Sequence, residues 1–330
     1  MAVLAPPVSL ARRPQAGLAP SGWLVLAAVV ALALALRVPV ATAVLGLVAF
    51  GALHNVLELR YVTGRFDTVL AGPFLALLVA LVTGVMVCRL LPPGNGSRAA
   101  EIGLSYVLLA VASVRCLGPR RSWLALSLAV LALAASVSFA FPAYHFVVLS
   151  HLHNVVPLFF LWEWSASLRP GRRGLFRAVN LGWVLVVPGL ILSGLFDPVL
   201  RAAPAALGGL GSFEVAGLVR TYAPPSLVPT DMGVRFLVVF AFMQTMHYVV
   251  WIGVLPRYAP EAAARFDARV PVLRGGRAWL LGLGLAAVLS VAFLLDYASG
   301  RSLYAAAASY HAYLEFPVLL ALVFSSGVRR

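Results

Sequence analysis

The chain has 330 residues, of which 62% are hydrophobic and 11% charged, with a mean hydropathy of +0.96. This composition leaves too little polar surface for a soluble globule, so we expect lipid around most of the chain. The net charge of +14 would suggest nucleic acid in a soluble protein, but the arginines lie mainly between apolar stretches, and we expect no nucleic-acid partner. Two cysteines without a CxxC unit argue against disulfide and iron–sulfur frameworks.

Apolar stretches of about 20 residues recur along the chain and predict an all-α, polytopic integral membrane helix bundle. Residues 1–21 form an N-terminal tail, and 22–330 form a single transmembrane domain with one long connection at 197–231. Ten spans are expected at 22–36, 38–59, 68–91, 101–117, 122–141, 143–164, 174–196, 232–255, 278–296 and 302–325. The break at Arg37-Val38-Pro39 is alternatively a kink, which would leave nine spans.

The arginines predict the orientation of the bundle, because loops on the cytoplasmic side retain positive charge. With ten spans and both termini cytoplasmic, eighteen of the 25 basic residues lie inside. The seven outside are Arg37, Arg89, Arg98, Arg201, Arg220, Arg235 and Arg301. We therefore expect a multi-pass protein, in the cytoplasmic (inner) membrane if the source is bacterial, with residues 197–231 on the outer side.

All six histidines fall within predicted spans, although polar groups are costly in lipid and usually face the interior of a bundle. They lie in the second, sixth, eighth and tenth spans, at His54, His145, His151, His153, His247 and His311. Residue counts from the outer ends place His151, His153 and His311 near mid-membrane, and His54 and His247 somewhat deeper towards the cytoplasm.

Two of these histidines begin the same local pattern, His54-Asn-Val-Leu-Glu58 and His311-Ala-Tyr-Leu-Glu315. A spacing of four residues places imidazole and carboxylate on one helical face, where both can ligate an ion or one can orient the other. Imidazole and carboxylate together suit Fe, Zn, Mn and Cu. The repeated pattern therefore predicts a metal site inside the bundle.

The sixth span holds His151-Leu-His153, whose side chains point about 200° apart on a helix. Only one of the two can therefore face a given ion, and the sequence does not distinguish them. His145 lies near the outer surface and is the weakest ligand candidate. In the eighth span, Tyr248 adjoins His247 and is a candidate catalytic residue, while Trp251 is expected to anchor the helix near the inner interface.

The pattern favours a membrane-embedded, metal-dependent oxidoreductase of the non-haem iron oxygenase, desaturase or hydroxylase type, acting on a lipid or isoprenoid substrate. An electron-donor protein is an additional possible partner. The expected metal ligands are His54, His247 and His311, with His151 or His153. Glu58 and Glu315 would ligate the metal or orient its ligands, and they join Tyr248 as candidate catalytic residues.

Two other functions use the same residues. In a b-type haem electron-transfer protein, His151 or His153 would ligate the haem iron together with His247 or His311. In a proton-coupled transporter, histidines and glutamates would form a titratable relay through the bundle. The sequence contains no P-loop, dinucleotide fingerprint or serine nucleophile elbow, which argues against nucleotide-driven and hydrolase functions.

Overall fold

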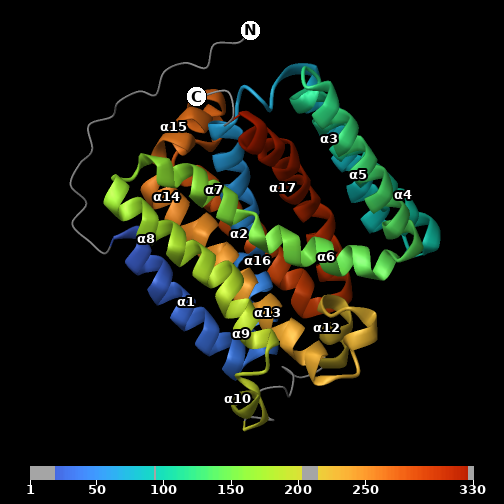
Figure 1. Cartoon of the computed structure of the whole chain (residues 1–330), viewed down its shortest axis with the longest axis vertical. Coiled ribbons are helices and arrows are strands. Elements are labelled where there is room, and N and C mark those ends of the chain that lie inside the picture. The colour runs from blue at the N-terminus through green and yellow to red at the C-terminus, as the bar shows by residue number, and fades with distance from the viewer. Residues whose placement is uncertain (1–18, 93, 203–214, 326–330) are drawn as a thin grey trace.

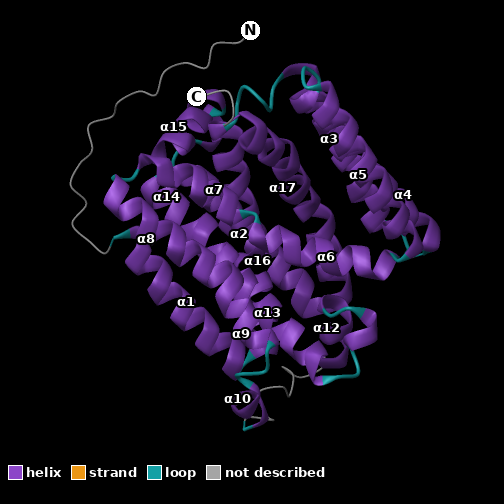
Figure 2. Ribbon diagram, viewed as in Figure 1, coloured by secondary structure: helices purple, strands orange, loops and turns teal. Residues whose placement is uncertain are grey.

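In the computed structural model, which describes residues 19–92, 94–202 and 215–325, these residues form helices and loops and no strand (Figures 1 and 2). Ten helical stretches in this part of the chain are long and apolar enough to cross a membrane. The prediction of an all-helical bundle with ten candidate spans is thus confirmed. Most of the predicted N-terminal tail, residues 1–18, lies outside the described residues.

The spans are formed by long helices and by shorter ones that follow each other directly. The α-helices are α1 (Pro20–Arg37), α2 (Pro39–Arg65), α3 (Gly72–Leu90), α4 (Asn95–Leu117), α5 (Arg121–Ala140), α6 (Pro142–Val155), α7 (Pro157–Trp164), α8 (Pro170–Leu181), α9 (Val187–Leu192), α10 (Asp197–Arg201), α12 (Val215–Tyr222), α13 (Asp231–Tyr248), α14 (Leu255–Tyr258), α15 (Pro260–Arg269), α16 (Gly276–Leu295) and α17 (Tyr297–Ser325). Short 3₁₀ turns lie at Ser165–Ser167, Pro225–Leu227 and Pro271–Leu273.

Proline fixes where many of these helices begin. Pro39, Pro142, Pro157 and Pro170 each occupy the first helical position, where the missing N–H costs no hydrogen bond and the fixed φ suits the helix. The residue before a proline is pushed out of the α-region, and Val38 accordingly has φ −143° and ψ 59°. Helices α1 and α2 are therefore separate elements, and each is long and apolar enough to be one of the ten candidate spans.

Two spans each contain a π-helical turn, at Gly182–Val186 and at Val249–Val254. A proline follows each turn, Pro188 in one span and Pro256 in the other. Proline has no N–H for the carbonyl four residues earlier, and its ring crowds that carbonyl, so the wider π turn relieves the conflict. The second turn begins two residues after His247, within the most buried span.

Burial identifies the helices at the centre of the bundle. In the span Asp231–Tyr258, 78% of the most apolar window is buried, against 56% in α2 and 50% in α17. The corresponding share is 6% in α5, which lies at the periphery with α3 and α4 (Figure 1). The three central spans α2, α13–α14 and α17 are also the ones that contain His54, His247 and His311.

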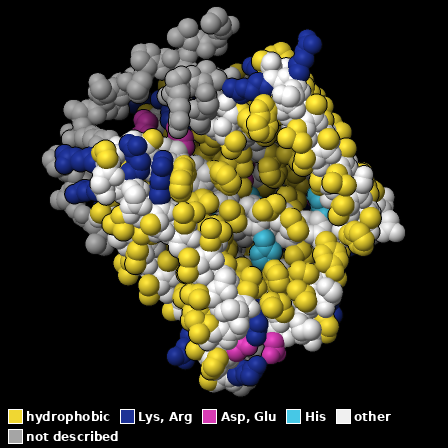
Figure 3. All heavy atoms as spheres, in the orientation of Figure 1, with side chains coloured by type: hydrophobic (Ala, Val, Ile, Leu, Met, Phe, Trp, Pro, Cys, Tyr) yellow, Lys and Arg dark blue, Asp and Glu magenta, His cyan; other side chains and the backbone are white. Residues whose placement is uncertain are grey.

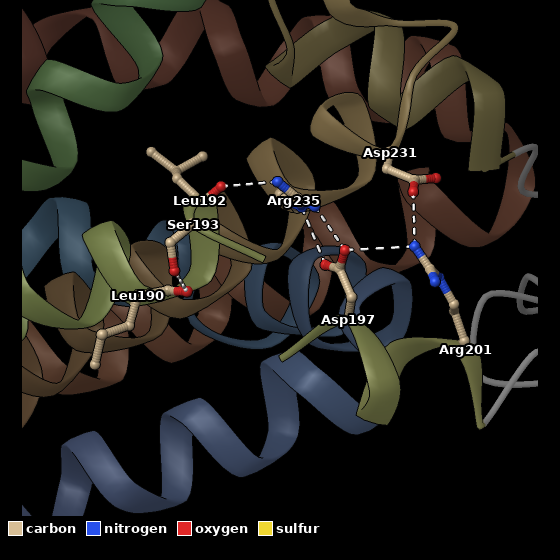
Figure 4. A network of polar contacts seen from close by, with 7 residues as sticks. All are labelled: Leu190, Leu192, Ser193, Asp197, Arg201, Asp231 and Arg235. Carbon is tan, nitrogen blue, oxygen red and sulfur yellow. Dashed lines mark hydrogen bonds and ion pairs between the residues drawn. The ribbon is translucent and has the colours of Figure 1, made fainter. Parts of the chain in front are cut away.

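One end of the bundle is joined by a cluster of ion pairs (Figure 4). The Arg235 guanidinium donates to both carboxylate oxygens of Asp197, at 3.0 and 2.6 Å, and to the Leu192 carbonyl oxygen at 2.9 Å. These hydrogen bonds hold the pKa of the Asp197 carboxyl below its usual range. Arg201 extends the cluster to Asp231, with an N–O distance of 3.0 Å. The cluster thus fixes the start of the long connection against α13. Residues 203–214 of that connection lie outside the described residues.

Gly194 makes this cluster possible, and its replacement should destabilise the protein. Its φ is +85°, and a Cβ there would lie 2.5 Å from a guanidinium nitrogen of Arg235. Gly194→Ala should therefore reduce stability by about 1–3 kcal/mol, measured as a lower thermal midpoint in detergent. Gly189→Ala is the matched control, because nothing lies within 4 Å of a Cβ at that helical position. Equal midpoints for the two variants would contradict this account.

Candidate metal centre

Five side chains from four separate helices meet inside the bundle. Each supplies one nitrogen or carboxylate oxygen, and these atoms all lie within 4.8 Å of one another. The group, called here the His/Glu cluster, consists of His54 and Glu58 on α2, His153 on α6, His247 on α13 and His311 on α17. His153 is half-buried and the other four are buried. Histidines distant in the chain therefore converge on one place that could hold a metal ion.

Hydrogen bonds at the far side of two rings fix which nitrogen faces the cluster. Nδ1 of His54 lies 3.1 Å from the Phe50 carbonyl oxygen, which can only accept, so Nδ1 holds the proton. Nδ1 of His153 lies 3.1 Å from Oε2 of Glu315, and it donates to that carboxylate. In both neutral rings, Nε2 is then left with a free lone pair. This is the arrangement in which an outer carboxylate or carbonyl orients a metal-binding imidazole.

The three Nε2 atoms of His54, His153 and His311 face each other. The His54–His311 distance is 3.3 Å, and the His311–His153 distance is 3.0 Å. If Nε2 of His311 carries a proton, it can donate that proton to only one of its two neighbours. When all three rings are neutral, the lone pair on Nε2 of the other neighbour is therefore left without a donor. Two nitrogens that each lie 2.0–2.1 Å from one ion are about 2.8–3.4 Å apart at right-angled to tetrahedral geometry. The two observed separations fall within this range.

The remaining two members of the cluster have no hydrogen-bond partner among the described residues. Both Glu58 carboxylate oxygens and both His247 ring nitrogens are buried without a hydrogen bond, and the one contact between them is the ion-pair distance of 3.5 Å from Nε2 of His247 to Oε2 of Glu58. Buried polar atoms without partners are costly, above all in a membrane interior without water. A cation bound by Glu58 and His247 would remove this cost.

Two predicted ligand candidates lie elsewhere. Nε2 of His151 is 2.8 Å from the Tyr222 carbonyl oxygen, and its ring packs against Phe236 and Phe240. The two faces of α6 therefore separate His151 from His153, as the helical geometry requires, and His153 is the one that joins the cluster. His145, the weakest candidate, pairs with the Ser138 hydroxyl at 3.0 Å.

The expected difference in depth between the histidines is wrong. His54 and His247 meet His153 and His311 at one level, because all their ligand atoms lie within 4.8 Å. Counting residues from the outer end of each span assumes that all spans begin in one plane with equal tilt. The four helices begin at different distances from the cluster, 15 residues before His54 on α2 but 11 before His153 on α6, so equal counts do not mean equal depth.

Two aromatic residues of the eighth span lie beside the cluster. The Tyr248 ring centre is 4.5 Å from that of His54, and its hydroxyl accepts a hydrogen bond from Gln244 at 2.7 Å. Trp251 was expected to anchor the helix at the interface, but it is fully buried, 6.2 Å from the His247 ring. That expectation is wrong, because a tryptophan one turn from an inward-facing histidine shares the histidine's buried side.

A second buried polar group positions α17, and sequence reasoning did not find it. The Arg89 guanidinium donates to Glu101 at 2.8 Å and to the Ala305 carbonyl oxygen at 2.8 Å. The Ser105 hydroxyl donates to that of Tyr313 at 2.9 Å. These contacts tie α3 and α4 to the helix that holds His311. The sequence does carry a signal for the Arg89–Glu101 pair, because the arginine lies near the end of one span and the glutamate near the start of the next.

The surface in Figure 3 is hollowed near its middle, where histidine side chains are visible among hydrophobic ones. In the cluster, the His153 side chain is the most exposed, at 18%.

No protein-family model, curated protein or solved structure matches the chain.

The two histidines of the sixth span allow a matched test of metal binding. His153→Ala should weaken metal affinity by more than the 10–100-fold that loss of an outer partner typically costs, since it removes a candidate ligand. His151→Ala should leave affinity unchanged, because that ring bonds the backbone of Tyr222. Metal titration of the purified variants measures both. Similar losses in the two would show that the cluster does not define the site.

Glu315 has a different predicted effect, because it lies behind His153 and outside the group of five candidate ligands. Glu315→Gln should lower metal affinity by about 10–100-fold while full occupancy is still reached at high metal concentration. Glu163→Gln is the control, since Glu163 pairs with Arg65 instead. Competition against a chelator measures both affinities, and loss of the site in Glu315→Gln would instead assign Glu315 as a ligand.

Proposed function

We propose that this protein is a membrane-embedded, metal-dependent oxidoreductase of the non-haem iron type that acts on a lipid or isoprenoid substrate. The observation behind the proposal is the convergence of four imidazoles and one carboxylate on a single position in the bundle. Isolated intramembrane histidines are commonly explained by bonds to a neighbouring helix. Four imidazoles that turn nitrogen atoms towards one another are better explained by a bound ion.

The ligand set supports iron as the bound metal. Imidazole and carboxylate are the ligands of non-haem iron(II) oxygenases, and thiolates, which favour copper(I) or zinc, are absent from the cluster. His54, His153, His247, His311 and Glu58 would hold the ion. Bound iron would supply O₂ activation, while Glu315 would hold His153 in its binding tautomer and Tyr248 would adjoin the reacting space. The electrons for such a reaction would come from a donor protein.

The surroundings of the cluster support a hydrophobic substrate. The hollowed face of Figure 3 is lined by hydrophobic side chains, and on α6 both Val148 and Leu152 are strongly exposed. A fatty acyl or isoprenoid chain dissolved in the bilayer could approach His153 along this face without crossing water. A polar substrate would have to leave water first, which makes it the less favourable choice.

The packing of the cluster argues against the haem alternative. Haem with two axial histidines needs a flat macrocycle between the two rings. The space between the four imidazoles is filled by the rings themselves, with ring centres 4.5–5.1 Å apart for the neighbouring pairs. In a proton-coupled transporter the buried Glu58 would carry the proton, but the Nε2 atoms that face one another would have no role.

We further propose that both chain ends lie in the cytoplasm. Helices α2, α7 and α14 end, and α1 begins, at the end of the bundle where α15 also lies (Figure 1). The positive-inside rule assigns this arginine-rich end to the cytoplasm. The ion-pair cluster of Arg235 and Asp197 would then face the outer side.

Metal analysis of the purified protein tests the proposal directly. We expect about one iron per chain and no Soret band, because the site has no place for a porphyrin. His247→Ala should lose most of the iron, with His145→Ala as the control outside the cluster. A preparation without stoichiometric iron, copper, manganese or zinc would refute the metal-dependent function. Conversion of membrane lipids by the iron-loaded protein, sought by mass spectrometry, would then identify the substrate.

A further inference from the structure

An aromatic path leads from the His/Glu cluster towards the arginine-rich end of the bundle. The Trp251 ring centre is 6.2 Å from that of His247 and 5.7 Å from that of Tyr61. The Tyr61 hydroxyl has a hydrogen bond with Arg65, which in turn pairs with Glu163. The Arg65 and Glu163 side chains are 31% and 28% exposed, so the path reaches the surface there.

Packing alone does not explain the residue types along this path. Trp251 is fully buried, and its indole N–H has no hydrogen-bond partner among the described residues, an arrangement that costs free energy which phenylalanine would avoid. Phe160 packs in the same group, 5.2 Å from Trp251 and 6.0 Å from Tyr61. Indole and phenol lose an electron to a strong oxidant far more readily than the phenyl ring of phenylalanine. The two rings that can be oxidised form the continuous path.

We propose that Trp251 and Tyr61 form an electron relay that carries oxidising equivalents from the metal to the surface at Arg65 and Glu163. The proposal rests on the redox metal of the proposed function. Its role would be to discharge an oxidised metal that has no substrate to attack, before the ligating imidazoles are damaged. Trp251 and Tyr61 are therefore positioned to protect the site and are not catalytic residues.

The steps balance as single-electron transfers. Hydrogen peroxide would take two electrons from the metal and, with two protons from solvent, become two water molecules, and two electrons would then pass one after the other from the Trp251 indole to the metal. Each time, Tyr61 returns an electron to Trp251 and releases its phenolic proton to water at the surface near Glu163. A thiol at the surface gives the Tyr61 phenoxyl one electron and one proton, which restores the phenol. Two such thiols, each oxidised by one electron, combine as a disulfide.

The test uses the full-length, iron-loaded protein in detergent, mixed with hydrogen peroxide without lipid substrate and frozen for electron paramagnetic resonance. The wild type should give a tyrosyl signal. Tyr61→Phe should abolish this signal and leave an indole radical in its place, and Trp251→Phe should lower the radical yield at least tenfold. Trp251→Tyr should restore much of it, because phenol can also be oxidised. Iron content and thermal midpoint, measured for every variant, identify any that have failed to fold.

Phe160→Leu is the matched control, since it alters packing around both relay rings without removing an oxidisable group, and it should leave the signal unchanged. Tyr248→Phe checks the nearest competing phenol, beside His54. A signal that depends on Tyr248, or one that survives in Trp251→Phe at full yield, would overturn the relay while the metal site stood. A wild type without any redox-active metal would overturn the relay and the proposed function together.

Discussion

The central constraint on this structure is that lone pairs inside a membrane need partners. The middle of the bundle is largely buried, so the imidazoles and carboxylates there need a donor, an acceptor or a cation. The outer nitrogens of His54 and His153 have such partners in Phe50 and Glu315. Their inner nitrogens, with those of His311, have only one another. Four helices of the bundle, α2, α6, α13 and α17, hold these side chains in place.

The helices that carry the His/Glu cluster include the most buried spans of the bundle. The span of α13 and α14 is the most enclosed, and α2 and α17 pack at the centre beside it, so that three of the histidines are held by the most buried spans. The fourth, His153, is on the broken span of α6 and α7 and has the most exposed side chain of the cluster. The cluster therefore has a more buried side and a more accessible one.

The sequence predicted the architecture well, because lipid imposes a simple pattern. Apolar length, prolines at helix starts and arginines between spans located ten spans to within several residues. It also predicted which histidines lie in spans, and the spacing from His54 to Glu58 identified a shared helical face. What it could not supply was the rotation of each helix relative to its neighbours. His151 and His153 differ only in that rotation, and their assignment required the three-dimensional arrangement.

Other features escaped prediction for a related reason. Trp251 lies in a π turn, which no local sequence rule distinguished from an ordinary helix near Pro256. The Arg89–Glu101 pair joins residues that were assigned to span ends, where charge is unremarkable. In both cases the packing of neighbouring helices, which a single window of sequence does not show, decided the outcome.

The π turn after His247 also affects how this helix could change. Such a turn is an α-helix with one surplus residue, which the wider turn absorbs. If the residues from Val249 to Val254 formed a regular α-helix with no residue removed, everything after them would rotate by about 100° relative to the half that holds His247. Arg257 would then leave the face of Trp23, and Tyr258 would turn away from Trp164. The π turn thus sets the rotation of one half of the span relative to the other, so that each half contacts its own neighbours.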